Sequence, residues 1–360
     1  MRMSKKMNNR LDKLRRGLKE RAIEAIMISQ PQNRHYISGF DGTAGFLLIT
    51  SQKKVLATDF RYVEQAKHQA GDFEVLQTGG KLEEWLPGLT GSLGIERLGF
   101  EADDISFSVY QRLRNVLAAS SIGIEFIPTE GFVESLRMIK EPSEIELIRK
   151  AAAISDAAMD YIHNSLQAGM AELEVAWELE QFLRRNGSQG IPFDIIVASG
   201  PNSALPHAKP SESIIKDGQP VVIDIGASMQ GYASDISRTF CTGEADDFFS
   251  KLYSIVLKAQ QAAIEGITDG MNAVQADNLA RQVIRQAGYG EQFGHSLGHG
   301  VGLAVHEKPY VSPSSTDELK NGMVFTIEPG IYIPKWGGIR IEDTVMLKNG
   351  KIELLSRAIK

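Results

Sequence analysis

Two pairs of acidic residues occupy strand-like segments in the second half of the chain, and each pair is symmetric about a predicted hairpin turn. Asp224 and Asp235 form the first pair, and Glu328 and Glu342 form the second. Residues directly opposed across an antiparallel pair have Cβ atoms about 4.5–5.5 Å apart. Two carboxylates at this distance repel one another unless a cation lies between them. Because His299 lies between the pairs in the sequence, the simplest compensating charge is a metal ion, or two.

The turn positions and the flanking residues support this placement. The first pair is centred between Met229 and Gln230, and the second is centred on Lys335. The segments VVIDI (221–225) and VFTIE (324–328), each with one acid, are otherwise suited to burial. A single acid in a strand is usually a solvated edge residue, but a buried charge without a partner costs several kcal/mol. Four acids in such strands therefore favour a metal site.

Histidines supply the remaining ligand chemistry. Carboxylates are hard ligands and imidazole is intermediate, so the four acids and His299 suit first-row divalent ions. Five such side chains could hold two ions about 3.5–4 Å apart with a shared hydroxide, which is a nucleophile at neutral pH. We expect His299 in a tight, glycine-rich turn over residues 294–302, with close backbone approach to the site. His207, His295 and His306 also lie beside glycine or proline turns.

Two other catalytic motifs have less support. The segment Gly294–Gly298 matches a Gly-x-Ser-x-Gly nucleophile elbow, but that mechanism requires an acid and then a histidine later in the chain. The last histidine is His306, so no room remains for the intervening strands. His295 and His299 would share one face of a helix, as in a zinc-binding His-Glu-x-x-His motif. The glycines disfavour a helix there, and no glutamate follows His295.

Length and composition limit the classes of protein. At 360 residues the chain exceeds the usual size of one core, which predicts two domains. The net charge of −6 argues against nucleic acid as a partner, because phosphate binding requires a basic face. The single cysteine, Cys241, excludes an intramolecular disulfide and indicates a reducing, cytoplasmic compartment. The basic N-terminus lacks the apolar core of a signal peptide, and no apolar run approaches the roughly 18 residues of a membrane span, so no membrane partner is expected.

Short apolar runs alternate with helical stretches over residues 1–139, which predicts an α/β N-terminal domain. No Gly-x-Gly-x-x-Gly follows any of these strands, so a nucleotide site has no support. We expect strands at 24–29, 45–51, 54–59, 73–78, 98–101 and 122–129. We expect helices at Asn9–Arg21, Arg61–Ala70 and Ser106–Leu117.

The domain boundary is predicted near Ile139–Pro142, because proline suits a first helical position, and residues 140–360 form the second domain. Strands joined by short turns, with helices grouped between them, predict an α+β domain with an antiparallel sheet. The helices would cover one face and leave the other for a site. We expect helices at 142–166, Glu172–Arg185, Asp247–Gly266 and Asn272–Ala287. We expect strands at 191–200, 219–227, 231–240, 323–330 and 338–347.

From Glu141 to its C-terminal residue the chain resembles the pita-bread metallopeptidases, which include methionine aminopeptidase, aminopeptidase P and prolidase. The resemblance implies a pita-bread fold for this domain. The motifs that carry it stand in the family's order: VIDIGA, SDISRTF, GHGVGLAVHE, TIEPGIY and GIRIED.

The same resemblance implies roles for the residues. The ligands of a dinuclear metal site would be Asp224, Asp235, His299, Glu328 and Glu342. Glu328 would also be the general acid and base. His207 and His306 would polarise the scissile carbonyl and the tetrahedral intermediate. Arg340 resembles a residue that supports the metal carboxylates, although a salt bridge within the sheet would also explain it, and His295 has a supporting role.

The N-terminal segments ISGFDGTAGFLLI and ATDFRYVEQA resemble a creatinase-type domain. Methionine aminopeptidases generally lack this domain, so the resemblance narrows to enzymes that cleave Xaa-Pro bonds. Prolidases often carry an arginine after the second substrate histidine, which is implicated in holding the free proline carboxylate. The matching position here is Tyr310, which favours aminopeptidase P over prolidase.

The resemblance therefore implies a metal-dependent exopeptidase that cleaves the bond before proline at the N-terminus of short peptides. In this mechanism two metal ions bind the water that attacks as hydroxide, and Glu328 takes the proton from that water and delivers it to the proline nitrogen. Manganese is the expected metal, with cobalt or zinc as alternatives, and a homodimer is the expected assembly. A creatinase-like amidinohydrolase or a non-catalytic module with the same fold would be expected to lose these ligands. A purely structural protein would leave the acidic pairs unexplained.

Overall fold

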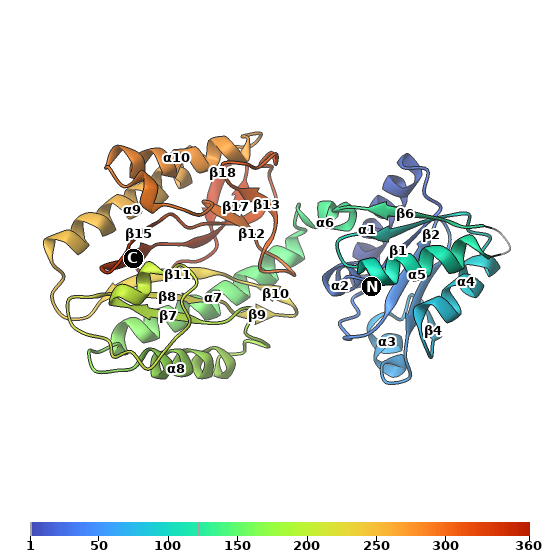
Figure 1. Ribbon diagram of the computed structural model, residues 1–360, viewed down its shortest axis with the longest axis horizontal. Helices are drawn as coiled ribbons and strands as arrows, with labels where there is room; N and C mark the ends of the chain where they lie inside the picture. The colour runs from blue at the N-terminus through green and yellow to red at the C-terminus, as the bar shows by residue number, and fades with distance from the viewer. Residues whose placement is uncertain (1, 121–122) are drawn as a thin grey trace. The chain divides into compact units, whose positions relative to one another are not determined.

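Two units, Met1–Arg137 and Met138–Lys360, divide the chain (Figure 1). The structure is a computed structural model that describes residues 2–120 and 123–360, with side chains described from residue 9. Within these ranges no helix combines the length and the apolar character that crossing a bilayer requires.

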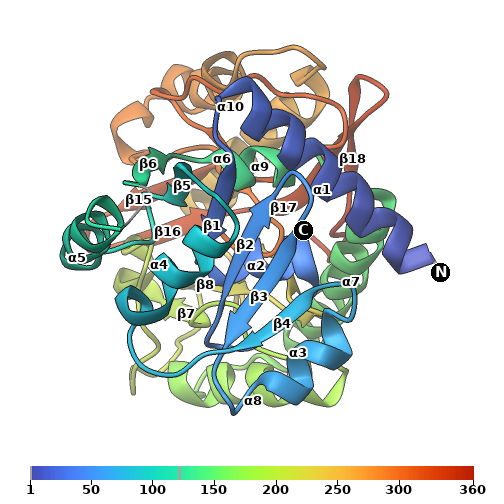
Figure 2. The same cartoon turned by 90° about the vertical axis from the view of Figure 1, so that its right-hand side faces the viewer.

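The first unit is an α/β unit built on one mixed sheet. Its strands are β1 (Ala25–Ile28), β2 (Phe46–Thr50), β3 (Lys54–Thr58), β4 (Glu74–Gln77), β5 (Arg97–Glu101) and β6 (Glu125–Thr129). Its helices are α1 (Arg2–Glu20), α2 (Pro31–Ser38), α3 (Val63–Gln69), α4 (Leu82–Ser92), α5 (Phe107–Ala118) and α6 (Phe132–Arg137). The strand order is β4-β3-β2-β1-β5-β6, and β1 runs antiparallel to β2 and parallel to β5 (Figure 2).

All six strands expected in this unit are present, although Ile122 of the last expected strand lies outside the described residues. Helices α1, α3 and α5 were expected, whereas α2, α4 and α6 were not. Helix α4 contains Pro87, Gly88 and Gly91, which all disfavour a helix. Leu86 in the same helix is 1% exposed in the core, so packing outweighs propensity there.

The second unit contains four helices and the remaining strands of the described chain. The helices are α7 (Pro142–Ser165), α8 (Glu172–Arg185), α9 (Asp247–Gly266) and α10 (Ala273–Gln286). The first strands are β7 (Ile196–Ser199), β8 (Pro220–Ile225), β9 (Ser228–Met229), β10 (Tyr232–Ala233) and β11 (Ile236–Cys241). The later strands are β12 (Gly298–Gly300), β13 (Glu307–Val311), β14 (Val324–Ile327), β15 (Gly330–Ile333), β16 (Gly337–Arg340), β17 (Asp343–Lys348) and β18 (Lys351–Leu354).

These strands form two main sheets, β11-β8-β7 and β13-β12-β14-β17-β18, with small hairpins β9/β10 and β15/β16. Each strand pairing assigned within this unit is antiparallel, which confirms the expected α+β architecture. Helices α7 and α8 pack against the first sheet, and α9 and α10 pack against the second. The two helical pairs lie on opposite sides of the strands (Figure 1). The inner faces of the sheets are therefore left for a site.

The four expected helices of this unit are present within one or two residues of their predicted ends. The prediction that His299 lies in a glycine-rich turn was wrong, because His299 is the central residue of strand β12. The flanking glycines are required by neighbouring backbone. A Cβ atom on Gly298 would lie 2.0 Å from the carbonyl oxygen of Thr326, and one on Gly300 would lie 2.2 Å from that of Lys308. Close packing of strands explains these glycines.

The register of the two acidic hairpins differs in one respect from the prediction. In β14/β17 and in β15/β16 the paired residues are symmetric about Lys335, so Glu328 and Glu342 face one another in the gap between these ladders, as predicted. The first pair is offset, because Asp224 pairs with Ser237 and not with Asp235. Asp235 lies two residues from that partner and therefore on the same face.

Candidate metal centre

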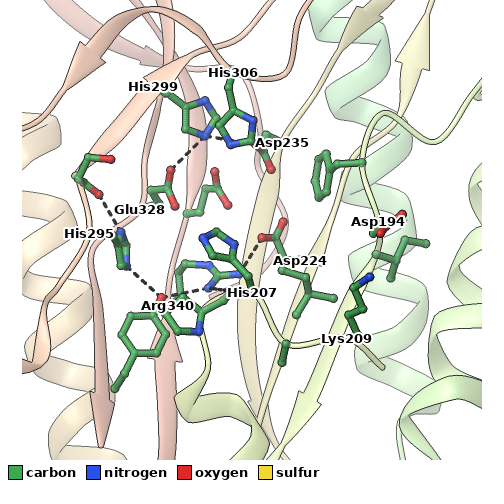
Figure 3. A pocket seen from close by; sticks show the side chains of 18 residues that line it. Asp194, His207, Lys209, Asp224, Asp235, His295, His299, His306, Glu328 and Arg340 are labelled. Carbon is green, nitrogen blue, oxygen red and sulfur yellow. Dashed lines mark hydrogen bonds and ion pairs between the residues drawn. The ribbon is translucent and has the colours of Figure 1, made fainter. Parts of the chain in front are cut away.

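All nine site residues expected from the sequence and from the family resemblance line one cavity of about 440 Å³ in the second unit (Figure 3). They are His207, Asp224, Asp235, His295, His299, His306, Glu328, Arg340 and Glu342. The cavity wall is assembled from strands of both sheets and from the loop that carries His207. Residues more than a hundred positions apart in the sequence therefore meet at one place.

A compact ligand set lies within this cavity. Asp235, His299 and Glu342 are all buried, and one potential ligand atom from each lies within 4.8 Å of the others. Nε2 of His299 is 3.6 Å from Oδ2 of Asp235 and 3.2 Å from Oε1 of Glu328. Asp224 on β8 belongs to the same cluster, because its charge acts on both Asp235 and Glu342.

Burial and mutual repulsion raise the proton affinity of three of these carboxyl groups. Burial raises the pKa of Asp235 well above its ordinary value, and the charges of Glu342 and Asp224 raise it further. Burial also raises the pKa of Glu342 well above its ordinary value, with Glu328 and Asp224 adding to the effect. Burial raises the pKa of Asp224, although the adjacent Arg340 opposes it. A cluster of this kind is costly in its ionised form unless positive charge is bound.

Glu328 differs from the other acids because it forms a hydrogen bond with His299. Burial would raise the pKa of Glu328, but the hydrogen bond with His299 and the imidazole charge outweigh burial and lower it to about 2. Burial likewise would lower the pKa of His299, and the same contact outweighs it and raises that pKa. Thr326 supports both residues, since its Oγ1 accepts from the His299 backbone N–H at 3.1 Å and donates to Oε1 of Glu328 at 3.0 Å.

The donor set fits divalent cations. Among the described residues, Oδ1 of Asp224 and Oε1 of Glu342 are buried and have no hydrogen-bond partner. Four carboxylates and one imidazole meet here, and the cavity wall contributes one buried guanidinium, that of Arg340. Buried oxygen atoms without partners, in a set of hard and intermediate ligands, are what a first-row divalent ion would satisfy.

Arg340 supports the ligand cluster from strand β16. Its Nη2 donates to Oδ2 of Asp224 at 2.7 Å, and its Nε donates to Oγ of Ser237 at 2.8 Å. Ser237 in turn donates to Oε2 of Glu342 at 2.6 Å. Nη1 of Arg340 donates to the hydroxyl of Tyr332 at 3.0 Å. Two carboxylates of the cluster are therefore held by one connected network.

His295 extends that network through the hydroxyl of Tyr332. Its Nε2 is 3.0 Å from the Tyr332 hydroxyl, and its Nδ1 is 2.8 Å from the carbonyl oxygen of Ser296. Burial lowers the pKa of His295. Both ring nitrogens are thus engaged by protein atoms, which suits a supporting position better than a ligand position.

His207 and His306 are exposed residues that line the cavity, and they differ in their surroundings. His207 follows the short 3₁₀ helix Gly200–Ala204. The ring of His306 lies 4.1 Å from the ring of His299, measured between centroids. Burial lowers the pKa of His306, and the charges of His299 and His207 lower it further against an opposing effect of Glu328. A neutral imidazole at this position can donate a hydrogen bond to a polar substrate atom.

Three contributors were missed from the sequence. Ser237 and Thr326 each lie two residues from a predicted acid on the same strand face, and that spacing was a usable signal. Tyr332 gave no local signal. Tyr310 pairs with His299 along the backbone, but its side chain is 44% exposed and lies outside the cavity lining.

Comparisons with known proteins agree with this geometry. The family model for metallopeptidase family M24 matches residues 146–349, and the creatinase/prolidase N-terminal domain model matches residues 10–139. A Xaa-Pro dipeptidase of Pyrococcus horikoshii is 39% identical over 350 residues, which cover 97% of each chain.

Solved structures extend the comparison. A Xaa-Pro dipeptidase from Bacillus anthracis superposes with a TM-score of 0.94 at 43% identity and covers 98% of both chains. An X-Pro aminopeptidase from Thermotoga maritima superposes with a TM-score of 0.89 at 38% identity, over 97% of this chain and 98% of that one. Both kinds of Xaa-Pro peptidase are thus represented among close structural relatives.

Proposed function

This chain belongs to metallopeptidase family M24, with a creatinase/prolidase N-terminal domain and a pita-bread C-terminal domain, and from that premise we propose that it hydrolyses the Xaa-Pro bond at the N-terminus of short peptides. The observation that carries the proposal is the buried cluster of Asp235, His299 and Glu342 beside two exposed histidines in one cavity. We assign residues 1–139 to the N-terminal domain and 140–360 to the catalytic domain.

The metal site would be formed by the cluster that the fold assembles. When bound, two divalent ions would lower the pKa of an attacking water and polarise the scissile carbonyl. Manganese is the metal we propose, with cobalt and zinc as alternatives. The unpartnered oxygens of Asp224 and Glu342 support their assignment as ligands. The remaining proposed ligands are Asp235, His299 and Glu328.

The chain's own residues would divide the work of proton transfer and charge stabilisation. Glu328 would accept a proton from water at its carboxylate and deliver it to the proline nitrogen, because it lies beside His299 on the wall of the cavity where the water would bind. His207 and His306 would donate hydrogen bonds to the carbonyl oxygen as negative charge develops there. Arg340 would hold Asp224, and Ser237 would hold Glu342, in fixed orientations.

The length of the peptides that are cleaved distinguishes a dipeptidase from an aminopeptidase. The relatives include proteins named as dipeptidases and as an aminopeptidase. Tyr310 in place of the arginine expected of prolidases favours the aminopeptidase. The test compares hydrolysis of Xaa-Pro dipeptides and Xaa-Pro-Yaa tripeptides by the manganese-loaded protein. A preference for tripeptides supports the aminopeptidase, cleavage of dipeptides alone contradicts it, and no cleavage of either contradicts the proposed function.

A creatinase-like amidinohydrolase is the second candidate. It is disfavoured because each of the five proposed ligands is a residue able to bind metal, and the same argument disfavours a non-catalytic module. Assay of the manganese-loaded protein with creatine beside the peptides distinguishes these functions. We further propose that the protein acts as a homodimer in the cytoplasm, which light scattering and cell fractionation would test.

A further inference from the structure

His306 depends on an irregular segment for its place in the cavity. Residues 302–306 form bends, without a helix or strand, and His306 is exposed. Its ring nevertheless lies 4.1 Å from that of His299, at an interplanar angle of 42°. An exposed imidazole on such a segment requires an anchor nearby if it is to hold one position.

The next residue, Glu307, provides that anchor. Its side chain is 7% exposed, and its Oε2 accepts a hydrogen bond from the backbone N–H of Ala304 at 3.3 Å. The carboxylate also fills the space beside Gly302, where a Cβ atom would lie 2.4 Å from Oε1. Glu307 therefore contacts the bend at two positions that precede His306.

Lys140 supplies the opposite charge. Its Nζ is 2.9 Å from Oε1 of Glu307, and its side chain is 1% exposed. The backbone of this segment is fixed, since the N–H of Lys140 donates to the carbonyl oxygen of Gly322 at 2.9 Å and Ile139 forms a β-bridge with Met323. The ammonium group is thus carried by a backbone tied to the start of strand β14.

Packing alone does not explain a charged pair at this position. Along β13, Glu307, Pro309 and Val311 are buried, whereas the intervening Lys308 and Tyr310 are exposed. The inward face of this strand is therefore apolar except at Glu307. Replacing a buried ion pair by apolar side chains of similar volume is often neutral or stabilising, so this pair is weak evidence for stability.

We propose that Lys140 and Glu307 are positioning residues for His306. The ion pair fixes the carboxylate that binds the Ala304 N–H, and this contact holds the 302–306 bend so that His306 stays beside His299. The inference rests on the proposed function for its kinetic test and stands on geometry alone for its spectroscopic test.

The kinetic test is a double-mutant cycle in the manganese-loaded full-length enzyme with an Xaa-Pro substrate. Glu307→Gln and His306→Ala are each expected to lower kcat by roughly tenfold or more, with KM changed by less than about threefold. If Glu307 acts through His306, the double variant has the kcat of His306→Ala alone. A double variant in which the two losses multiply would overturn the proposal.

A second set of variants separates positioning from stability. The Lys140→Met/Glu307→Met double variant is expected to keep the melting temperature and to show the low kcat of Glu307→Gln, whereas Lys140→Arg is expected to retain most of kcat. The control is Leu183→Ala, on the buried face of α8, which is expected to lower the melting temperature and to leave kcat per folded molecule unchanged. Wild-type kcat in the double methionine variant would contradict the proposal.

The spectroscopic test uses metal-free protein and does not depend on activity. Imidazole resonances are recorded in long-range ¹H–¹⁵N spectra, with His306→Gln used to assign His306. Glu307→Gln is expected to shift the His306 resonance and to leave that of His68, in the other unit, unchanged. An unshifted His306 resonance would overturn the proposal. Failure of wild-type protein to cleave any Xaa-Pro peptide would instead contradict the proposed function.

Discussion

The Arg340 guanidinium binds one oxygen of Asp224, with Nη2 2.7 Å from Oδ2, and the other oxygen of that carboxylate has no hydrogen-bond partner among the described residues. The same guanidinium binds Ser237, which donates to Glu342. One buried side chain thus orients two proposed ligands and leaves an oxygen of each available to a cation. We therefore expect Arg340 to influence metal affinity as well as to form a salt bridge within the sheet.

Replacing Arg340 by methionine should weaken manganese binding by about 10–100-fold, the usual effect of losing a residue that orients a ligand. Titration of metal-free protein with Mn²⁺ measures the change. Tyr332→Phe removes one hydrogen bond of Arg340 and keeps its contact with Asp224, so its effect should be smaller. An unchanged affinity of Arg340→Met for Mn²⁺ would show that Arg340 only stabilises the sheet.

Glu328→Gln tests the proposed proton carrier. The amide keeps a carbonyl oxygen but cannot accept and release a proton, so kcat should fall by about 10²–10⁴-fold. The assay is run at saturating Mn²⁺ with metal content measured in the same sample, because Glu328 is also a proposed ligand. A fully loaded variant with kcat near that of wild type would remove Glu328 from proton transfer.

Gly298→Ala tests the close approach of β12 to its neighbour. The new Cβ atom would lie 2.0 Å from the carbonyl oxygen of Thr326, so the strand that carries His299 must move. We expect a lower melting temperature and weaker Mn²⁺ binding. The matched control is Gly88→Ala in α4, where no atom lies within 4 Å of the new Cβ and helix propensity should add about 1 kcal/mol of stability. Equal effects of both substitutions would contradict this account.

Glu101 should make the first unit sensitive to pH. Burial raises its pKa from 4.5 to about 7, although the backbone N–H groups of Gln30 and Ser29 and the Asn33 amide donate to it and oppose this effect. Between pH 4.5 and 7 the folded state therefore holds a proton that the unfolded state has released. The stability of this unit should fall as pH rises through that window, by up to about 1.4 kcal/mol per pH unit, and should level off above it.

Fluorescence of Trp85 in a Trp177→Phe/Trp336→Phe background reports unfolding of the first unit, because Trp85 is then the only tryptophan and packs against Phe46. Urea unfolding at pH 5, 6 and 7 gives the change in the free energy of unfolding per pH unit. Glu101→Gln mimics the protonated form and should make the free energy of unfolding nearly independent of pH. If the free energy of unfolding of Glu101→Gln still falls as pH rises, another group is responsible for the pH dependence.

The acidic pairs illustrate how much of the site the sequence could predict. The register about Lys335 was predictable, because one symmetry extends through both ladders on either side of Glu328 and Glu342. The register of the first hairpin differs from the prediction because Gln230 and Gly231 both have positive φ and together form a two-residue turn. The pairing partner therefore changed by two residues, which preserved the side-chain face.

Other features depended on contacts that local patterns do not encode. The glycines around His299 suggested a turn, but their role is to let β12 lie against the backbone of Thr326 and Lys308. Helix α4 forms despite Pro87 because its apolar side chains pack in the core. Tyr332 reaches Arg340 only after the β15/β16 hairpin has formed, so its contribution required the fold.

Manganese bound per chain, measured by elemental analysis after equilibrium dialysis of metal-free protein, tests the central claim most directly. The account predicts two ions per wild-type chain, and one or fewer in an Asp235→Ala/Glu342→Ala variant that remains folded by circular dichroism. Retention of no manganese by the wild-type protein, or of two ions by the double variant, would contradict the assignment of this cavity as the metal centre.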